Sequence, residues 1–131
     1  MKIWTIPRIP KSANKMLRAH WSQRRRDQES WREHVRRSCG RRRRRFEGKV
    51  RLSIVVYRRT RQDPDNAYAS VKNLLDALVK EGWLEDDSPQ LLSLRVSERE
   101  EPRKIEQRTE LLWKPVSPTG SGNGQEKLER K

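Results

Sequence analysis

Apolar residues are scarce in this sequence, and this scarcity limits the fold to one small hydrophobic core. Only 31% of the 131 residues are hydrophobic, whereas 38% are charged. A chain of this length is expected to form one domain that buries roughly two-thirds of its unfolded surface. No run of about 18 apolar residues is present, which argues against a membrane span. We therefore expect one domain over residues 1–114 and a disordered tail over residues 115–131, where Pro, Ser, Gly and charged residues dominate.

Short periodic segments predict the order strand–helix–strand–helix–strand–strand. Strands are expected where β-favouring or alternating residues occur, at residues 2–6, 49–58, 91–97 and 105–113. The two main helices are expected at residues 19–38 and 66–81, with residues 11–19 as a loop and residues 98–104 as a turn. The first helix presents a narrow stripe formed by Trp21, Gln28, Trp31 and Val35. This order predicts a small α+β domain in which two main helices pack on a mixed β-sheet.

Charge is distributed unevenly along the chain. Lys and Arg total 32 against 18 Asp and Glu, a net charge of +14, which favours a polyanionic partner such as nucleic acid. Residues 18–45 are strongly basic, and the residues expected to contact phosphates there are Arg24, Arg25, Arg26, Arg41, Arg42, Arg43, Arg44 and Arg45. Residues 63–87 instead carry seven acids and two lysines, a net charge of −5, and include five of the six aspartates. A protein that only binds a phosphate backbone gains nothing from an acidic segment of this kind.

The second predicted helix has two distinct faces. On a helical wheel, one face is apolar and should meet the sheet, and it consists of Ala67, Val71, Leu74, Leu75 and Leu78. The opposite face holds Asp65, Lys72 and Asp76. Lys72 and Asp76 lie one turn apart, so they are interpreted either as a surface ion pair or as part of a site.

Asp63 and Asp65 flank a proline that restricts Asp63 to extended geometry. Residues i and i+2 of an extended segment point the same way, so both carboxylates could reach one cation. The alternative is that Asp65 caps the helix, which leaves Asp63 unexplained. Asp86 and Asp87 raise the number of carboxylates to four, and aspartate oxygens favour Mg²⁺, or alternatively Mn²⁺, over zinc. Because a helix separates the two pairs, the chain must double back after Gly82, or a second subunit must complete the site.

Several short motifs occur in order along the chain. They are Asp63-Pro64-Asp65-Asn66, Lys72, Leu75-Asp76-Ala77-Leu78, Gly82 and Asp86-Asp87-Ser88, preceded by Pro10-Lys11-Ser12-Ala13-Asn14. Over about residues 3–113, the chain resembles the RusA family of Holliday junction resolvases.

The resemblance implies a Mg²⁺-dependent endonuclease that acts as a homodimer on four-way DNA junctions in recombination and repair. It would nick two strands symmetrically. The family's acidic metal ligands fall on Asp63, Asp65 and Asp87, and its important lysine falls on Lys72. The gap between the aspartate pair and this lysine is three residues longer than in the best-known member. Asp86 and Asp76 either assist or are structural.

The expected location is the cytoplasm of a bacterial or phage-infected cell, without membrane partners. The N-terminal segment lacks the long apolar centre of a secretory signal. Cys39 is the only cysteine, which excludes an internal disulfide and fits a reducing compartment.

Two other interpretations stay open at the level of the sequence. A non-catalytic basic nucleic-acid-binding protein would account for the net charge, but it would not account for the aspartates. A family member that binds junctions without cutting them would keep most of the motifs.

Overall fold

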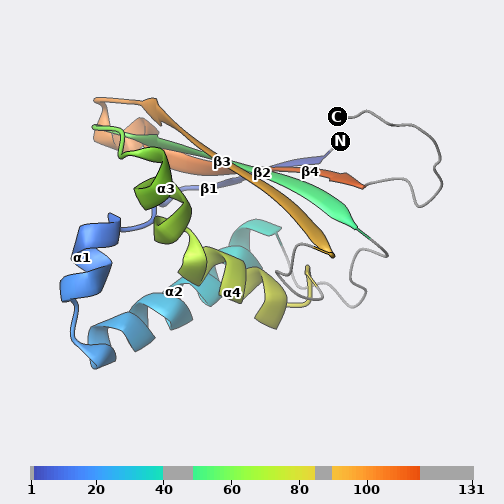
Figure 1. The fold of residues 1–131 in the computed structure, drawn as a ribbon, viewed down its shortest axis with the longest axis horizontal. Helices are drawn as coiled ribbons and strands as arrows, with labels where there is room; N and C mark the ends of the chain where they lie inside the picture. Colours follow the sequence, from blue (N-terminus) through green and yellow to red (C-terminus); the bar gives the residue numbers. More distant parts are fainter. Residues whose placement is uncertain (1, 40–48, 85–89, 116–131) are drawn as a thin grey trace.

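The computed structural model describes residues 2–39, 49–84 and 90–115, which form one small α+β domain (Figure 1). Its elements are β1 (Lys2–Ile6), α1 (Ala13–Arg18), α2 (Trp21–Cys39), β2 (Val50–Arg58), α3 (Pro64–Ser70), α4 (Lys72–Lys80), β3 (Leu92–Glu100), the short 3₁₀ helix η1 (Lys104–Glu106) and β4 (Arg108–Pro115). The four predicted strands are confirmed, although β3 continues into the predicted turn and β4 begins at Arg108, because the first two residues of the last predicted strand belong to η1. Residues 41–45, Asp86, Asp87 and the predicted tail beyond Pro115 lie outside the described residues.

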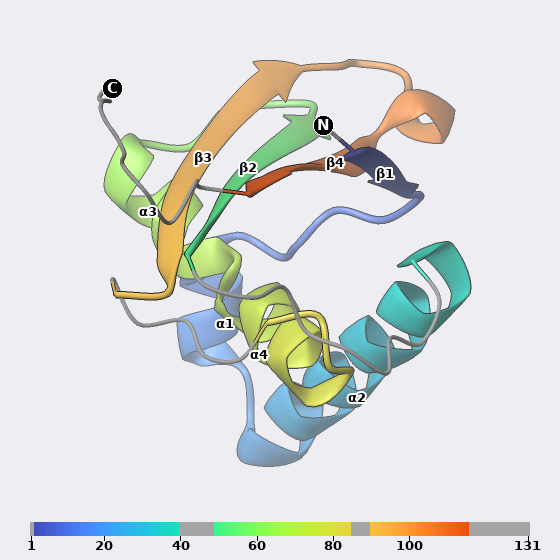
Figure 2. The ribbon, with the colours of Figure 1, turned by 90° about the vertical axis from the view of Figure 1, so that its right-hand side faces the viewer.

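The strands form one mixed sheet in the order β1-β4-β2-β3. β4 pairs antiparallel with both β1 and β2, whereas β2 and β3 run parallel. Parallel neighbours require a crossover connection, and α3 and α4 lie in the segment that supplies it. The helices α1 to α4 all lie on one side of the sheet, so no described helix covers the opposite face (Figure 2). We call that opposite face the open face.

The core lies between the helices and the sheet because β2 alternates in polarity. Val50, Leu52, Ile54 and Val56 are at most 2% exposed, and the residues between them are exposed or half-buried. The predicted apolar face of the second helix also enters this core, with Val71, Leu74 and Leu78 completely buried. The helical-wheel prediction is therefore confirmed.

The first main helix differs from its prediction in two respects. The predicted loop at residues 11–19 contains α1, which is capped by Ser12, whose hydroxyl accepts a hydrogen bond from the Lys15 backbone N–H at 3.3 Å. In the predicted stripe, Trp31 is completely buried but Trp21 is 66% exposed. Asp27, one turn before Trp31, is 6% exposed and takes the buried position. A carboxylate is tolerated in a core only when it has a partner. Apolar periodicity does not reveal such partners, so it did not predict the burial of Asp27.

The second main helix starts earlier than predicted and is divided in two. It begins at Pro64 rather than at residue 66, because proline suits the first helical turn, where its missing N–H leaves no bond unmade. The division falls at Val71, whose φ is −91° and ψ is 6°. Just before it, the Ser70 hydroxyl donates to the Ala67 carbonyl oxygen at 2.8 Å. Such local side-chain bonds compete with regular helix geometry.

Candidate active site

The first two predicted metal ligands lie at the start of α3. Asp63 is the N-cap residue in extended geometry, with φ −60° and ψ 151°, and Asp65 lies in the first helical turn. Both side chains are exposed, and neither carboxylate forms an ion pair within 4 Å of a described residue. Negative charge at a helix N-terminus is favoured by the helix dipole.

Both earlier interpretations of this aspartate pair need correction. Asp65 is helical, so the two carboxylates do not project from one extended segment. The capping alternative is also wrong, because the N-cap residue is Asp63 and its side chain makes no capping hydrogen bond. Pro64 causes both errors, since its fixed φ starts the helix before Asp65. Capping therefore explains neither carboxylate, and both remain available to a ligand.

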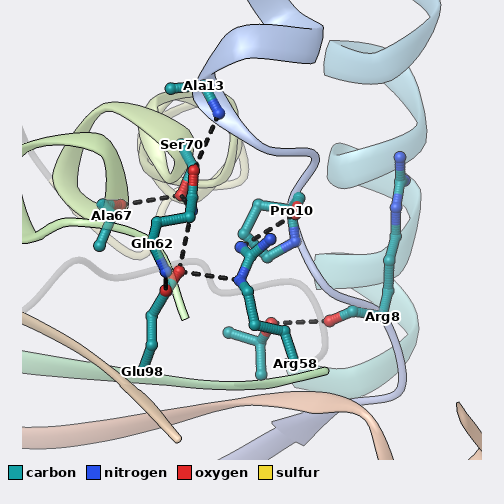
Figure 3. Close-up of polar contacts among 9 residues, drawn as sticks. Arg8, Pro10, Ala13, Arg58, Gln62, Ala67, Ser70 and Glu98 are labelled. Carbon is teal, nitrogen blue, oxygen red and sulfur yellow. Dashed lines mark hydrogen bonds and ion pairs between the residues drawn. The ribbon is translucent and has the colours of Figure 1, made fainter. Parts of the chain in front are cut away.

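Gln62, directly before Asp63, is held by a buried polar network (Figure 3). Its backbone N–H and its side-chain amide both donate to the Glu98 carboxylate of β3, the latter at 2.9 Å. Its side-chain oxygen accepts a hydrogen bond from the Ala13 backbone N–H at the start of α1, at 3.1 Å. The loop before Asp63 is thus joined to both the sheet and the N-terminal segment.

Arg58, the last residue of β2, completes this network. Its Nε lies 2.8 Å from Glu98 Oε2, so the two side chains form a buried ion pair. One of its terminal nitrogens donates to the Pro10 carbonyl oxygen at 3.1 Å. Burial lowers the pKa of the Arg58 guanidinium, and the Glu98 charge opposes that shift. The network therefore places the Pro10 segment beside the loop that carries Asp63.

A groove runs between α1, α2 and the α3–α4 pair. Its first part encloses about 410 Å³ and is lined by Lys11, Arg24, Asn66 and Lys72, among others. Asn66 follows Asp65 in the chain, so the groove reaches the acidic end of α3. Lys72 is exposed, and it lines this groove together with residues of α1 and α2.

The second part of the groove is more strongly basic. It encloses about 610 Å³, and its cationic lining residues are Arg8, Lys11, Lys15, Arg18 and Arg26. The two parts share Lys11, Ala19, Gln23 and Asp27 as lining residues, so they adjoin. We call the set Lys11, Lys15, Arg18, Arg24, Arg26 and Lys72 the basic groove.

Asp27 is the acid at the junction of the two parts of the groove. Its carboxylate accepts hydrogen bonds from Arg8 at 2.6 Å and from the Asn73 amide at 2.7 Å. Lys11 lies at 3.9 Å, and the Arg8 guanidinium lies 4.6 Å from the centre of the Trp31 ring. Asp27 therefore holds α2, α4 and the segment after β1 together. In the sequence, the one feature that could have indicated the burial of Asp27 is its position one helical turn before Trp31.

The predicted phosphate-contacting arginines are not equivalent. Arg26 lines the basic groove. Arg24 lines it as well, but two of its nitrogens donate to the Leu17 and Ala19 carbonyl oxygens at 3.0 and 3.1 Å. Arg25 lies 3.8 Å from Glu29 on the exposed side of α2. The remaining predicted arginines, residues 41–45, lie outside the described residues.

Not every acid of the acidic segment is available to a metal ion. Glu81, whose side chain is 3% exposed, pairs with Arg32 at 2.8 Å and with Arg36 at 3.5 Å, and so joins α4 to α2. Asp76 is half-buried, and it forms no ion pair with Lys72 within 4 Å. The predicted surface pair is therefore not formed.

The described residues do not contain a complete metal-binding cluster. Within residues 2–39, 49–84 and 90–115, no three His, Cys, Asp or Glu side chains come together in a way that could hold a metal ion. The third predicted ligand, Asp87, and its neighbour Asp86 lie beyond that part of the chain. Cys39 is no substitute, because burial raises the pKa of its thiol to about 12.

Comparison with protein-family models, with curated proteins and with solved structures found no match to this chain. In the described part of the chain, no helix is both long and apolar enough to cross a membrane.

Proposed function

We propose that this chain is a Mg²⁺-dependent, structure-selective DNA endonuclease that resolves four-way junctions by paired symmetric nicks. It would act as a homodimer in recombination and repair. The observation that supports this proposal most is that two exposed aspartates without a described ion-pair partner, Asp63 and Asp65, closely precede Asn66, which lines the groove. Cations attract a phosphate backbone, whereas unpaired acids beside them repel it unless they bind a metal ion.

The chemistry of Asp63 and Asp65 fits a hard divalent cation. Both offer only carboxylate oxygens, which Mg²⁺ and Mn²⁺ prefer. Their side chains have no competing partner among the described residues. Together with Asp87 they would hold the ion, and a bound Mg²⁺ supplies polarisation of a phosphate oxygen and a lower pKa for coordinated water.

The other residues have roles that follow from their positions. Lys72 lines the groove close to Asn66, where its charge would offset the negative charge that develops on phosphate oxygens. Lys15, Arg18 and Arg26 would hold the flanking backbone through sequence-independent contacts. Gln62 and Glu98 would keep the Asp63 loop in place while DNA binds.

The test uses the full chain with a labelled synthetic four-way junction, in Mg²⁺ or in EDTA. Asp65→Asn removes one charge at nearly constant shape. We expect cleavage to fall by roughly a hundredfold or more, the scale expected for loss of one transition-state-stabilising group. Junction binding in EDTA should be unchanged or tighter, because a repulsive charge is removed.

A matched control and a second arm complete this experiment. Glu106→Gln makes the same chemical change at an exposed position on η1 and should leave cleavage unchanged. Combining Lys15→Ala with Arg18→Ala should weaken binding at low salt while the acids stay intact. Cleavage by Asp65→Asn at the wild-type rate would show that the proposed metal site is wrong. Binding without cleavage by the wild-type protein in either Mg²⁺ or Mn²⁺ would favour the non-catalytic binder.

A further inference from the structure

A second cationic hollow lies on the open face, away from the basic groove. It encloses about 480 Å³, and its polar lining consists of Arg51, Ser53, Ser93, Arg95 and Lys114. We call these five residues the open-face cradle. Arg51, Arg95 and Lys114 are exposed. No described acid lines this hollow, and none of these three cations forms an ion pair within 4 Å of a described acid.

Strand register concentrates like charges in this cradle. Arg51 of β2 lies directly opposite Lys114 of β4, and Arg95 of β3 lies opposite Ser53 in the next row. Directly opposed residues have Cβ atoms roughly 5 Å apart, and like charges in that arrangement destabilise a sheet. A bound anion would remove this repulsion, and the two serine hydroxyls could donate hydrogen bonds to it.

At the other end of the same face, the cation of β4 has an acidic partner. There Arg108 lies 3.2 Å from Glu110 and stacks on the Tyr57 ring at 3.8 Å. The Tyr57 hydroxyl also donates to Glu110, at 3.1 Å. Arg108 is therefore neutralised within the sheet, whereas the three cations of the cradle have no described acid within 4 Å.

We propose that the open-face cradle binds the phosphate backbone of a second DNA segment. The cradle residues lie on the open face, whereas α3, which follows Asp63 and contains Asp65, lies with the other helices on the opposite side of the sheet (Figure 2). The cradle includes Arg51 near the start of β2, and Asp63 comes after the end of that strand. Arg58 lies seven positions after Arg51, which corresponds to roughly 23 Å along a strand. One straight DNA segment in the basic groove cannot also reach the cradle, so the protein would bridge two segments. The inference rests on the DNA-binding part of the proposed function but not on cleavage.

The test measures DNA binding in EDTA, where cleavage does not contribute. Arg95→Ala combined with Lys114→Ala removes two cradle cations. The control combines Arg103→Ala with Lys104→Ala, which removes the same charges from the turn and η1 before β4. Affinity for a synthetic four-way junction, which presents more than one duplex segment and can therefore occupy both the basic groove and the cradle, is measured across a salt series. Two lost phosphate contacts should reduce the slope of log affinity against log salt by about 1.8, at about 0.9 per contact.

A second measurement tests bridging directly. Two duplexes with different fluorophores are mixed, one is captured on beads, and recovery of the other is measured. The wild-type protein and the control should recover more of the second duplex than the cradle variant, in which only the two basic grooves of the proposed homodimer remain to bridge DNA. An unchanged slope together with unchanged recovery in the cradle variant would overturn the proposal, as would a defect confined to duplex RNA. A change in oligomeric mass in this variant would identify the face as a contact between copies and would also overturn it. Failure of the wild-type protein to bind DNA at all would instead reject the proposed function.

Discussion

Arg58 and Glu98 are opposite charges on the helix-facing side of the sheet, where apolar side chains otherwise dominate. Their side chains are only 8% and 4% exposed. The period of two in each strand indicates this placement, because Arg58 follows Ile54 and Val56, and Glu98 follows Val96. Their contact was not predictable, because it depends on the parallel register between β2 and β3.

Removing Glu98 should therefore be costly. Glu98→Ala would leave the Arg58 guanidinium buried without its counter-charge and would remove two acceptors of Gln62. Breaking a buried ion pair from one side typically costs about 3–5 kcal/mol. We expect a loss of this size in the free energy of unfolding, measured by urea titration with tryptophan fluorescence.

Glu100→Ala is the matched control for this change. Glu100 lies two residues further along β3, is 66% exposed, and is 4.0 Å from the exposed Arg61. Exposed pairs contribute less than about 1 kcal/mol, so this variant should remain close to wild type. Equal losses in the two variants would contradict the structural role given to the buried pair.

At the scale of elements, the end of α4 shows a match between sequence and local geometry. Gly82 has a φ of 86°, a conformation that favours glycine. Its N–H donates to the Val79 carbonyl oxygen at 3.1 Å, and the Trp83 N–H donates to that of Leu78 at 2.9 Å. These two bonds form a Schellman motif. The predicted helix end was confirmed because this signal is local.

Substitutions at Gly82 should lower the free energy of unfolding by an amount that depends on how well the new residue tolerates a positive φ. Gly82→Ala should lower the free energy of unfolding by about 1 kcal/mol, and Gly82→Asn should lower it less, because asparagine tolerates this region better. Thermal unfolding followed by circular dichroism measures both. An alanine variant as stable as wild type would mean that α4 ends without this motif.

The break at Val71 and the existence of α1 show where element prediction failed. The break accompanies a single side-chain bond from Ser70 and complete burial of Val71, neither of which changes the apolar periodicity of the segment. α1 has only six residues and one buried residue, Ala13, so it carries almost no periodic signal. A hydrophobic pattern with a period of 3.6 residues does not reveal short helices that are stabilised by tertiary contacts.

For the whole molecule, the net charge of +14 separates into surfaces with different uses. Some cations are neutralised within the fold, as Arg8 is by Asp27 and Arg32 by Glu81. Other cations gather in the basic groove, where Lys11 is within 4 Å of Asp27, and in the open-face cradle, where Arg51, Arg95 and Lys114 form no ion pair with a described acid. The net charge indicates a polyanionic partner. Only the fold distinguishes the cations that are neutralised by nearby acids from those that could bind such a partner.

The proposed homodimer can be tested on the intact protein. Paired symmetric nicks require two active sites, so sedimentation equilibrium should give twice the chain mass of 15.7 kDa. The measurement belongs at the concentration used for junction cleavage, because assembly depends on concentration. A mass of one chain under conditions where both strands are nicked together would contradict the dimer.

The sequence by itself determined the α+β class, the core faces of β2 and of the second main helix, the end of that helix and the candidate aspartates. These features depend on local periodicity and on side-chain chemistry, which a linear pattern retains. Only the tertiary structure decided the strand order, the burial of Asp27 and Glu98, the groove beside Lys72 and the open-face cradle. Each of these joins residues distant in the chain, and strand register and helix packing set those contacts through the folding of the chain as a whole.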